Sequence, residues 1–229
     1  MKNSVIYYLL LFILISMSET SFAQDWANLA KYETQNNQLP PKHSGEKRIV
    51  LMGDSITEFW SQIQPEFFAN TSYINRGISG QTTPQMLIRF RPDVLKLHPD
   101  VVIILAGVND IAGNTGPTTN DAIFGNIISM VELAKANKIK VILCSVLPAN
   151  NFYWRPNEKA AETIIQLNLL IQSYAKEHDI PYVDYHSAMA DAKKGLPKEF
   201  SNDGVHPNLT GYQTMEPLLE KAIQQVLTK

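Results

Sequence analysis

The sequence predicts an α/β protein in which a doubly wound, five-stranded parallel sheet lies between two layers of helices. Its strongest predicted strands are apolar throughout, as strands covered on both faces are. These strands alternate with longer segments of helical periodicity, which is the pattern of a three-layer α/β/α fold. The length, 229 residues, suits one domain of this kind.

Five short segments are expected to be strands, and the run DVVIIL at 100–105 is the most strand-like of them. The single cysteine, Cys144, lies within the fourth, so no intrachain disulfide can form. We expect an inert, buried thiol there. The predicted strands are 48–52, 72–75, 100–105, 139–146 and 181–185.

Helical periodicity follows most of the predicted strands. A proline inside a helix kinks or breaks it, so Pro92 is expected to bend or split one segment, and Pro217 to bend the last. A short helix is also expected before the first strand. The predicted helices are 26–32, 84–97, 121–136, 157–178 and 209–227.

The first residues are typical of a secretory signal peptide. Lys2 precedes an apolar run over 5–17, and Ser21-x-Ala23 is a small-x-small cleavage pattern. The alternative is a membrane anchor, but the run falls short of the roughly 20 residues that span a bilayer. We therefore expect a signal peptide over 1–23, an N-terminal extension over 24–46 and one domain over 47–229. The mature chain is expected to be exported, periplasmic or secreted, without stable membrane insertion.

Charge argues against one class of partner. The formal net charge is -2 and no basic patch dominates, so nucleic acid is not expected to bind. The sequence predicts no particular oligomeric state.

Small and polar residues follow the predicted strands at their carboxyl ends. In doubly wound sheets, ligands bind at this edge. The segments concerned are Gly53-Asp54-Ser55, Asn75 to Thr82, Gly107-Val108-Asn109-Asp110, Leu147 to Asn151 and, near the end of the chain, Ser201 to Asn208.

These residues include the groups that a serine hydrolase needs. A serine hydroxyl needs a base, most often a histidine oriented by a carboxylate, and Asp203-x-x-His206 supplies such a pair for Ser55. The developing oxyanion needs hydrogen-bond donors. The backbone N–H groups of Ser55 and Gly80 and the side-chain amide of Asn109 are the candidates.

Each residue also has a structural alternative. Ser55 could be a helix N-cap with Glu58 completing a capping box, and Gly80 could be only a turn residue. Three aspartates, Asp54, Asp110 and Asp203, lack the regular spacing of a metal-binding loop, so no metal is expected. The nucleophile elbow G-x-S-x-G is absent, as are the common nucleotide-binding motifs.

The chain resembles the SGNH (GDSL-type) hydrolases. The resemblance rests on Gly53-Asp54-Ser55, Gly80, Gly107-x-Asn109-Asp110 and Asp203-x-x-His206-Pro207, in that order, and extends from about residue 47 to the end. It implies a flavodoxin-like sheet, Ser55 as nucleophile, Asp203 and His206 as its activating pair, and Ser55, Gly80 and Asn109 as the oxyanion hole. One departure is Ile56, where the family pattern has leucine. No cofactor is implied.

The function expected from this resemblance is hydrolysis of carboxylic esters through an acyl-enzyme. Aromatic rings and polar groups suit a sugar, so Trp60, Tyr153, Trp154 and Arg155 are expected to bind substrate. Alternatively, Phe152 and Trp154 only close the core beneath a loop. Secreted members of the family often deacetylate polysaccharides, which favours an O-acetylesterase acting on acetylated carbohydrate. The expected binding partner is accordingly a small-molecule or glycan ester. The alternatives are a lysophospholipase or thioesterase and, more distantly, a non-catalytic glycan-binding module.

Overall fold

The computed structural model describes residues 25–69, 72–157 and 159–228. Its centre is a parallel sheet of five strands in the order β2-β1-β3-β4-β5, which confirms the predicted doubly wound fold. The strands are β1 (Ile49–Gly53), β2 (Tyr73–Gly77), β3 (Val101–Leu105), β4 (Lys140–Cys144) and β5 (Tyr182–Val183). The expected signal peptide lies outside the described residues.

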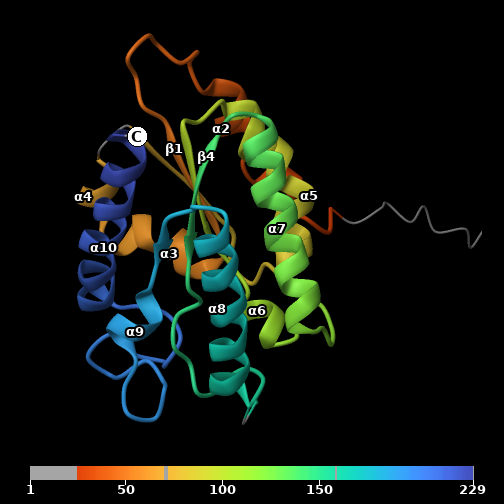
Figure 1. Cartoon of the computed structure of the whole chain (residues 1–229), viewed down its shortest axis with the longest axis vertical. Coiled ribbons are helices and arrows are strands. Elements are labelled where there is room, and N and C mark those ends of the chain that lie inside the picture. Colours follow the sequence, from red (N-terminus) through yellow and green to blue (C-terminus); the bar gives the residue numbers. More distant parts are fainter. Residues whose placement is uncertain (1–24, 70–71, 158, 229) are drawn as a thin grey trace, which may run out of the picture.

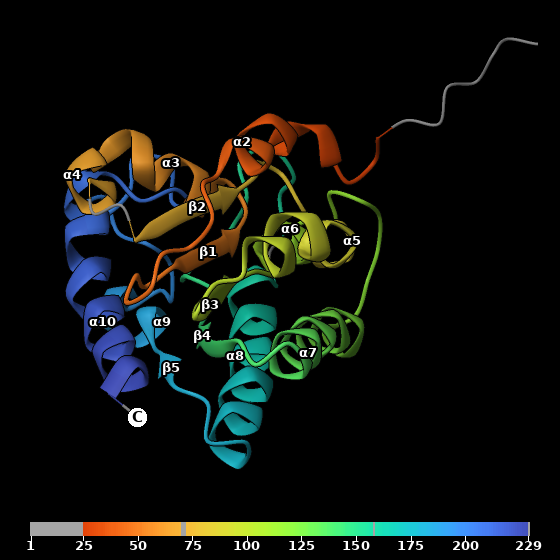
Figure 2. The same cartoon turned by 90° about the horizontal axis from the view of Figure 1, so that it is seen from above.

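Helices cover both faces of the sheet (Figures 1 and 2). One layer contains α3 (Ser55–Ile63), α4 (Pro65–Phe68) and α10 (Leu209–Thr228), and the other contains α5 (Thr83–Asp93), α7 (Asn120–Ala136) and α8 (Ala160–Glu177). Shorter elements are η1 (Leu29–Lys31), α2 (Glu33–Gln38), η2 (Leu95–Leu97), α6 (Val108–Ile111) and α9 (Tyr185–Met189).

The central strands are buried because neither of their faces reaches water. Every residue of β1 and β3 is buried, as their continuous apolar sequences predict. Cys144 is likewise buried at the end of β4, and burial raises the pKa of its thiol to about 12. The thiol is therefore protonated at neutral pH and inert, as expected.

Two predicted helices differ from those observed. Pro92 lies near the end of α5, which stops at Asp93, and the 3-10 turn η2 follows, so the predicted segment 84–97 is split. The helix predicted over 26–32 is wrong: η1 covers only its last part, and α2 follows it.

The segment before β1 packs against the sheet near its edge strand β2. The Tyr32 side chain is buried, and its hydroxyl donates a hydrogen bond to the carbonyl of Gly77. Arg76 places its guanidinium 4.6 Å from the Tyr32 ring centroid and donates from Nε to Asn36 at 3.0 Å. Residues 25–38 thus support the strand that leads to Gly80.

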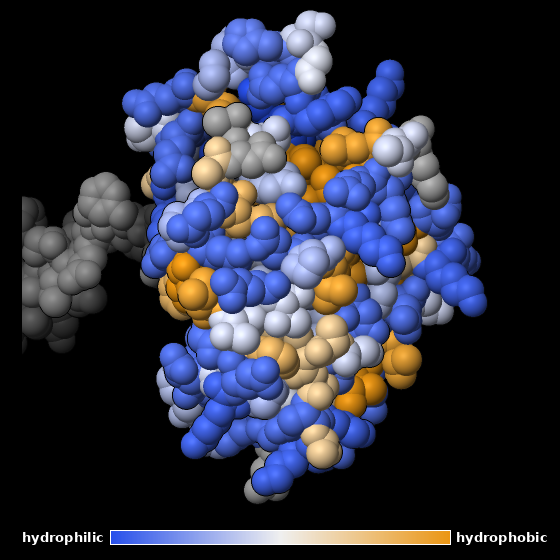
Figure 3. Space-filling view, turned by 90° about the vertical axis from the view of Figure 1, so that its left-hand side faces the viewer, coloured by the Kyte–Doolittle hydropathy of each residue, from blue (hydrophilic) through white to orange (hydrophobic). Residues whose placement is uncertain are grey.

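None of the helices in the described ranges is long and apolar enough to cross a membrane. The face shown in Figure 3 is mostly hydrophilic, with hydrophobic residues scattered among polar ones.

Gly77 is expected to tolerate no side chain. A Cβ atom there would lie 2.2 Å from the backbone nitrogen of Glu58 and 2.7 Å from the carbonyl oxygen of Asp54, and neither can move without shifting α3. We expect Gly77→Ala to lower the free energy of unfolding by on the order of 3 kcal/mol, measured by urea denaturation. In α7, a Cβ atom added to Gly125 would meet no described atom within 4 Å beyond its own helix backbone and chain neighbours, so Gly125→Ala is the matched control. Equal effects of the two variants would contradict this account of the β2–α3 contact.

Candidate active site

The turn between β1 and α3 places Ser55 at the carboxyl edge of the sheet. Gly53 makes the turn possible, because a Cβ atom there would lie 2.1 Å from Thr57 Oγ1 and 2.9 Å from the Leu105 carbonyl oxygen. Asp54 is the helix N-cap and accepts a hydrogen bond from the Ile56 N–H at 3.0 Å. The capping role considered for Ser55 therefore belongs to its neighbour, and the Ser55 hydroxyl is available for another partner.

That partner is His206. Ser55 Oγ lies 2.9 Å from His206 Nε2, and His206 Nδ1 lies 2.7 Å from Asp203 Oδ2. Partial burial raises the pKa of Asp203, but hydrogen bonds from the His206 ring and from backbone N–H groups outweigh it and hold this pKa below its usual value. The carboxylate is thus ionised at neutral pH and can orient the imidazole. This is the arrangement that activates a serine hydroxyl.

Hydrogen bonds within the loop that carries His206 hold its backbone in place. Asp203 Oδ1 accepts hydrogen bonds from the N–H groups of Val205 at 2.9 Å and His206 at 2.8 Å. Gly204 adopts a positive φ of 81°, which a glycine reaches without strain. Just beyond the loop, Tyr212 of α10 donates to the Ile56 carbonyl of α3 at 2.8 Å. This contact holds α10, and with it the loop, beside the serine.

The three expected oxyanion donors line one cavity with Ser55 and His206. The cavity measures about 450 Å³, and both Gly80 and Asn109 line it. Within the described part of the chain, the backbone N–H groups of Ser55 and Gly80 donate to no acceptor. Asn109 Nδ2 donates one hydrogen bond, to the Gln81 carbonyl at 3.1 Å, and has a second hydrogen left. All three groups are therefore free to bind a substrate oxygen.

Two aromatic residues of the loop after β4 lie at the mouth of this cavity. Tyr153 is 66% exposed and Trp154 is 36% exposed, and both line the cavity. The Trp154 ring centroid lies 6.3 Å from that of His206. Phe152, in contrast, is fully buried, so the core-closing alternative fits Phe152 and not Trp154.

Two residues expected to bind substrate do not line the cavity. Trp60 is only 2% exposed and stacks between Phe67 and Tyr212, so the expectation for Trp60 was wrong. Arg155 lies outside the lining and donates a hydrogen bond to the carbonyl of Gly113.

Three residues of the lining were missed by sequence reasoning: Phe59, Ser79 and Asn114. Phe59 lies four residues after Ser55, so helical spacing alone places it on the same face of α3. Its ring centroid lies 5.4 Å from that of His206. Ser79 adjoins Gly80 and could have been included with it. Asn114 had no local signal, because its contacts arise from the tertiary fold.

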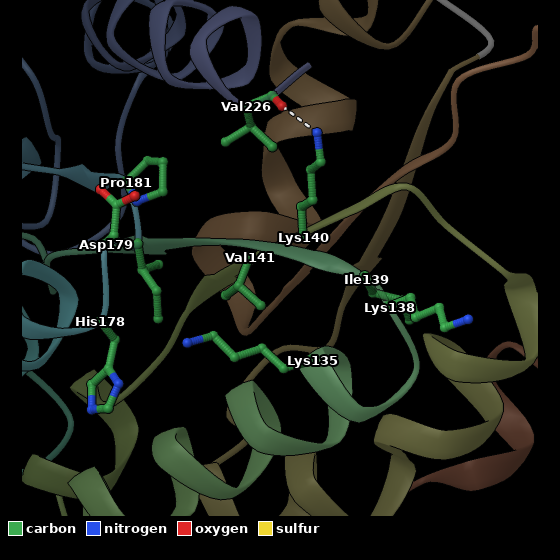
Figure 4. A pocket seen from close by; sticks show the side chains of 10 residues that line it. Lys135, Lys138, Ile139, Lys140, Val141, His178, Asp179, Pro181 and Val226 are labelled. Atoms are coloured by element: carbon green, nitrogen blue, oxygen red, sulfur yellow. Dashed lines mark hydrogen bonds between the residues drawn. The ribbon is translucent and has the colours of Figure 1, made fainter. Parts of the chain in front are cut away.

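A second cavity, of about 350 Å³, opens at the opposite edge of the sheet (Figure 4). Its lining includes Lys140 and Val141 at the start of β4 and Pro181 just before β5. The Lys140 side chain extends toward the end of α10, where Nζ donates to the Val226 carbonyl at 2.7 Å. Amino ends of the strands form this cavity, whereas the Ser55 cavity lies at their carboxyl ends.

Two buried carboxyl groups, those of Asp54 and Asp110, lie near the carboxyl ends of β1 and β3. Burial raises the pKa of Asp54 to about 7, and the nearby charge of Asp110 adds to this. Burial also raises the pKa of Asp110 to about 6, although Thr83 opposes the shift through hydrogen bonds from its N–H and hydroxyl. A negative charge on either group is therefore unfavourable in the folded protein.

Asp54→Asn is expected to change how stability depends on pH. Because the folded-state pKa of about 7 exceeds the ordinary value of 3.8, the wild-type carboxyl favours folding below pH 3.8, and this contribution is lost as the pH rises through 7. An amide does not titrate, so the variant should gain on the order of a few kcal/mol relative to wild type between about pH 4 and pH 8. Urea denaturation across this range measures the gain. The exposed Asp121→Asn is the control, and a constant difference between Asp54→Asn and wild type would refute the shift.

Known proteins resemble this chain in both sequence and structure. The model of the GDSL-like lipase/acylhydrolase family matches residues 51–214. An acetylxylan esterase of Geobacillus stearothermophilus is 26% identical over 201 residues, which cover 75% of this chain and 91% of that protein. Thioesterase 1/protease 1/lysophospholipase L1 of Escherichia coli is also 26% identical, over 78% of this chain and 84% of its own. A crystal structure of a GDSL-like lipase from Bacteroides thetaiotaomicron superposes with a TM-score of 0.85 at 50% identity, covering 87% of this chain and 98% of that one.

Proposed function

Because the chain belongs to the GDSL-like lipase/acylhydrolase family and is a carboxylic ester hydrolase, we propose that it removes acetyl groups from acetylated carbohydrate, with Ser55 as its nucleophile. The observation that carries the substrate class is the lining of the Ser55 cavity. That lining combines polar groups with aromatic rings and, among the described residues, contains no aliphatic side chain. A long acyl chain would find few apolar partners there, whereas an acetyl group needs few.

The proposed reaction begins with attack of Ser55 Oγ on the ester carbonyl carbon. His206 Nε2 takes the serine proton as the new C–O bond forms, and Asp203 stabilises the resulting imidazolium. The tetrahedral intermediate then collapses, its bond to the alcohol oxygen breaks, and His206 returns the proton to that oxygen. A water molecule attacks the acyl-enzyme in the same way, which releases the acid and restores Ser55.

Three donors are proposed to stabilise the negative charge of this intermediate. They are the backbone N–H groups of Ser55 and Gly80 and the remaining N–H of the Asn109 amide. The free state of the two backbone donors supports this assignment, because no existing hydrogen bond has to break when the oxyanion forms.

The alcohol part of the substrate is proposed to lie on Tyr153 and Trp154. Exposed aromatic rings next to the Ser55 cavity offer flat apolar surfaces on which sugar rings stack. The related proteins do not decide between substrates, since an acetylxylan esterase and a lysophospholipase share the same 26% identity with the chain. The choice of substrate class therefore rests on the residues that line the Ser55 cavity.

Export remains part of the proposal. It is supported by the apolar run at 5–17 and the cleavage pattern at Ser21-x-Ala23, and an exported enzyme would meet its acetylated glycan outside the cytoplasm.

Aryl esters of increasing acyl length test the proposed substrate class. We expect kcat/KM to fall at least about tenfold from acetyl to octanoyl, because extra methylenes lack apolar partners. Tyr153→Ala should raise KM for an acetylated xylo-oligosaccharide and leave the KM for aryl acetate unchanged. Leu169→Ala, which alters an exposed apolar side chain on α8 outside the cavity, is the matched control. A preference for octanoyl esters would instead favour a lipid or thioester substrate.

A further inference from the structure

Trp154, Asn114 and Asn109 form a continuous chain of hydrogen bonds that ends at the proposed oxyanion hole. Trp154 Nε1 donates to Asn114 Oδ1 at 3.1 Å, and Asn114 Nδ2 donates to Asn109 Oδ1 at 2.9 Å. Asn114 Nδ2 also donates to the Gly80 carbonyl at 3.2 Å. One exposed side chain thus contacts two of the three residues that supply the proposed oxyanion donors: the side-chain amide of Asn109 and the carbonyl of Gly80.

The chemistry of the end groups fixes the direction of this chain. An indole N–H can only donate, so the oxygen of the Asn114 amide must face Trp154, and its NH2 group must face away. The carbonyl oxygen of Gly80 can only accept, which agrees with that orientation. Asn109 then receives a donor at Oδ1, so its own NH2 group is directed away from Asn114.

This orientation matters because the two ends of an asparagine amide differ: the oxygen accepts hydrogen bonds and the NH2 group donates them. In the observed orientation, Asn109 Nδ2 donates to the Gln81 carbonyl at 3.1 Å and keeps one hydrogen for substrate. A flipped amide would present its oxygen to the developing oxyanion and repel it. The contact from Asn114 opposes such a flip, because the flip would set two NH2 groups against each other.

The hydrogen bond from Asn114 to the Gly80 carbonyl holds the residue that supplies the second proposed donor, the Gly80 N–H. Gly80 has a positive φ of 76°, and among the described residues other than its chain neighbours only the Asn114 side chain, at 3.9 Å, comes within 4 Å of where its Cβ would lie. Glycine is the most flexible residue, so a loop that presents its N–H benefits from a fixed carbonyl on the same residue. Asn114 supplies that fixed point.

Asn114 is itself held from both sides. Its backbone N–H donates to the Asn109 carbonyl at 3.0 Å, in the turn that follows α6. Arg155, next to Trp154, donates to the carbonyl of Gly113, so the aromatic loop contacts this turn at two points. The side chain therefore lies in a defined place although it is exposed.

We propose that Asn114 is a positioning residue that orients the Asn109 amide and the Gly80 carbonyl for oxyanion binding, and that the Trp154 indole N–H fixes Asn114 in turn. The inference rests on the proposed roles of Asn109 and Gly80. It assigns Trp154 a second task besides contact with the alcohol part of the substrate.

The test compares kcat and KM for aryl acetate in Asn114→Ala, Trp154→Phe, the double variant and Asn109→Ala. We expect Asn114→Ala to lower kcat about tenfold with KM nearly unchanged, less than the roughly 10²–10³ expected for Asn109→Ala, since it misorients a donor without removing it. Trp154→Phe should cause a smaller loss, and the double variant should lose no more than Asn114→Ala alone, because both act through one contact. Asn137→Ala, an exposed asparagine at the end of α7, is the control.

A second readout separates positioning from general damage. Methylboronic acid adds to a serine hydroxyl as a tetrahedral anion, so its inhibition constant reports on the oxyanion hole. In Asn114→Ala the inhibition constant should rise by about the same factor by which kcat falls, while the melting temperature stays unchanged. Normal kcat in Asn114→Ala alongside an impaired Asn109→Ala would overturn this inference alone. Normal kcat in Asn109→Ala would instead overturn the proposed oxyanion hole.

Discussion

Ser55→Ala is expected to abolish ester hydrolysis, with kcat falling by roughly 10⁴–10⁶. The variant keeps the cavity, His206 and the oxyanion donors but has no oxygen to attack the carbonyl carbon. Water would have to attack without a positioned nucleophile, so only a residual rate is left. Hydrolysis of aryl acetate, followed by release of the aryl alcohol, measures the loss.

The control for this variant is Ser61→Ala on the same helix. The Ser61 hydroxyl donates to the Glu58 carbonyl at 3.1 Å and lies outside the cavity, so its loss should leave kcat unchanged. Both variants should melt near the wild-type temperature, which separates a catalytic effect from unfolding. If Ser55→Ala hydrolysed aryl acetate at the wild-type rate, the enzyme's nucleophile would lie elsewhere, and the chain's resemblance to a serine hydrolase would not extend to its mechanism.

Asp203→Asn is expected to lower kcat by about 10⁴ through the tautomer of His206. Asp203 Oδ1 accepts backbone hydrogen bonds, so the amide oxygen should take that place and Nδ2 should face His206 Nδ1. Two donors cannot share one hydrogen bond, so His206 would carry its proton on Nε2. A protonated Nε2 cannot accept the proton of Ser55, and the hydroxyl stays unactivated although the loop keeps its shape.

The rate of aryl acetate hydrolysis as a function of pH measures this effect. Asp191→Asn is the matched control, because Asp191 also accepts backbone hydrogen bonds in a loop, from Lys193 and Gly195, but lies outside the cavity. A loss of less than tenfold in Asp203→Asn would mean that the carboxylate does not set the tautomer of the histidine.

Much of the site could be predicted because its residues follow strand ends. Parallel strands bring their carboxyl ends to one edge, so Ser55, Gly80 and Asn109 meet there whatever the intervening helices are. The register confirms this, since Gly53 pairs with both Gly77 and Leu105. Residues at strand ends are placed by the sheet, and the sheet follows from apolar runs that can be read directly.

Residues beyond the strand ends were harder to predict. Trp60 lies five residues after Ser55 on a helix, and this spacing turns it into the core, whereas Phe59 at four residues faces the cavity. Asn114 contacts the Trp154 loop, which comes from a distant part of the sequence. Contacts of this kind depend on how loops pack, and neither periodicity nor spacing encodes that.

Covalent labelling tests the central claim, that Ser55 is the nucleophile, most directly. Diethyl p-nitrophenyl phosphate would form a bond between Ser55 Oγ and phosphorus and release p-nitrophenolate, while the serine proton passes to His206. Peptide mapping by mass spectrometry then locates the diethyl phosphoryl group. We predict one equivalent of p-nitrophenolate and a single adduct, on the peptide that contains Ser55, with none formed in Ser55→Ala. An adduct on any other residue, or hydrolysis that continues without labelling, would contradict the account.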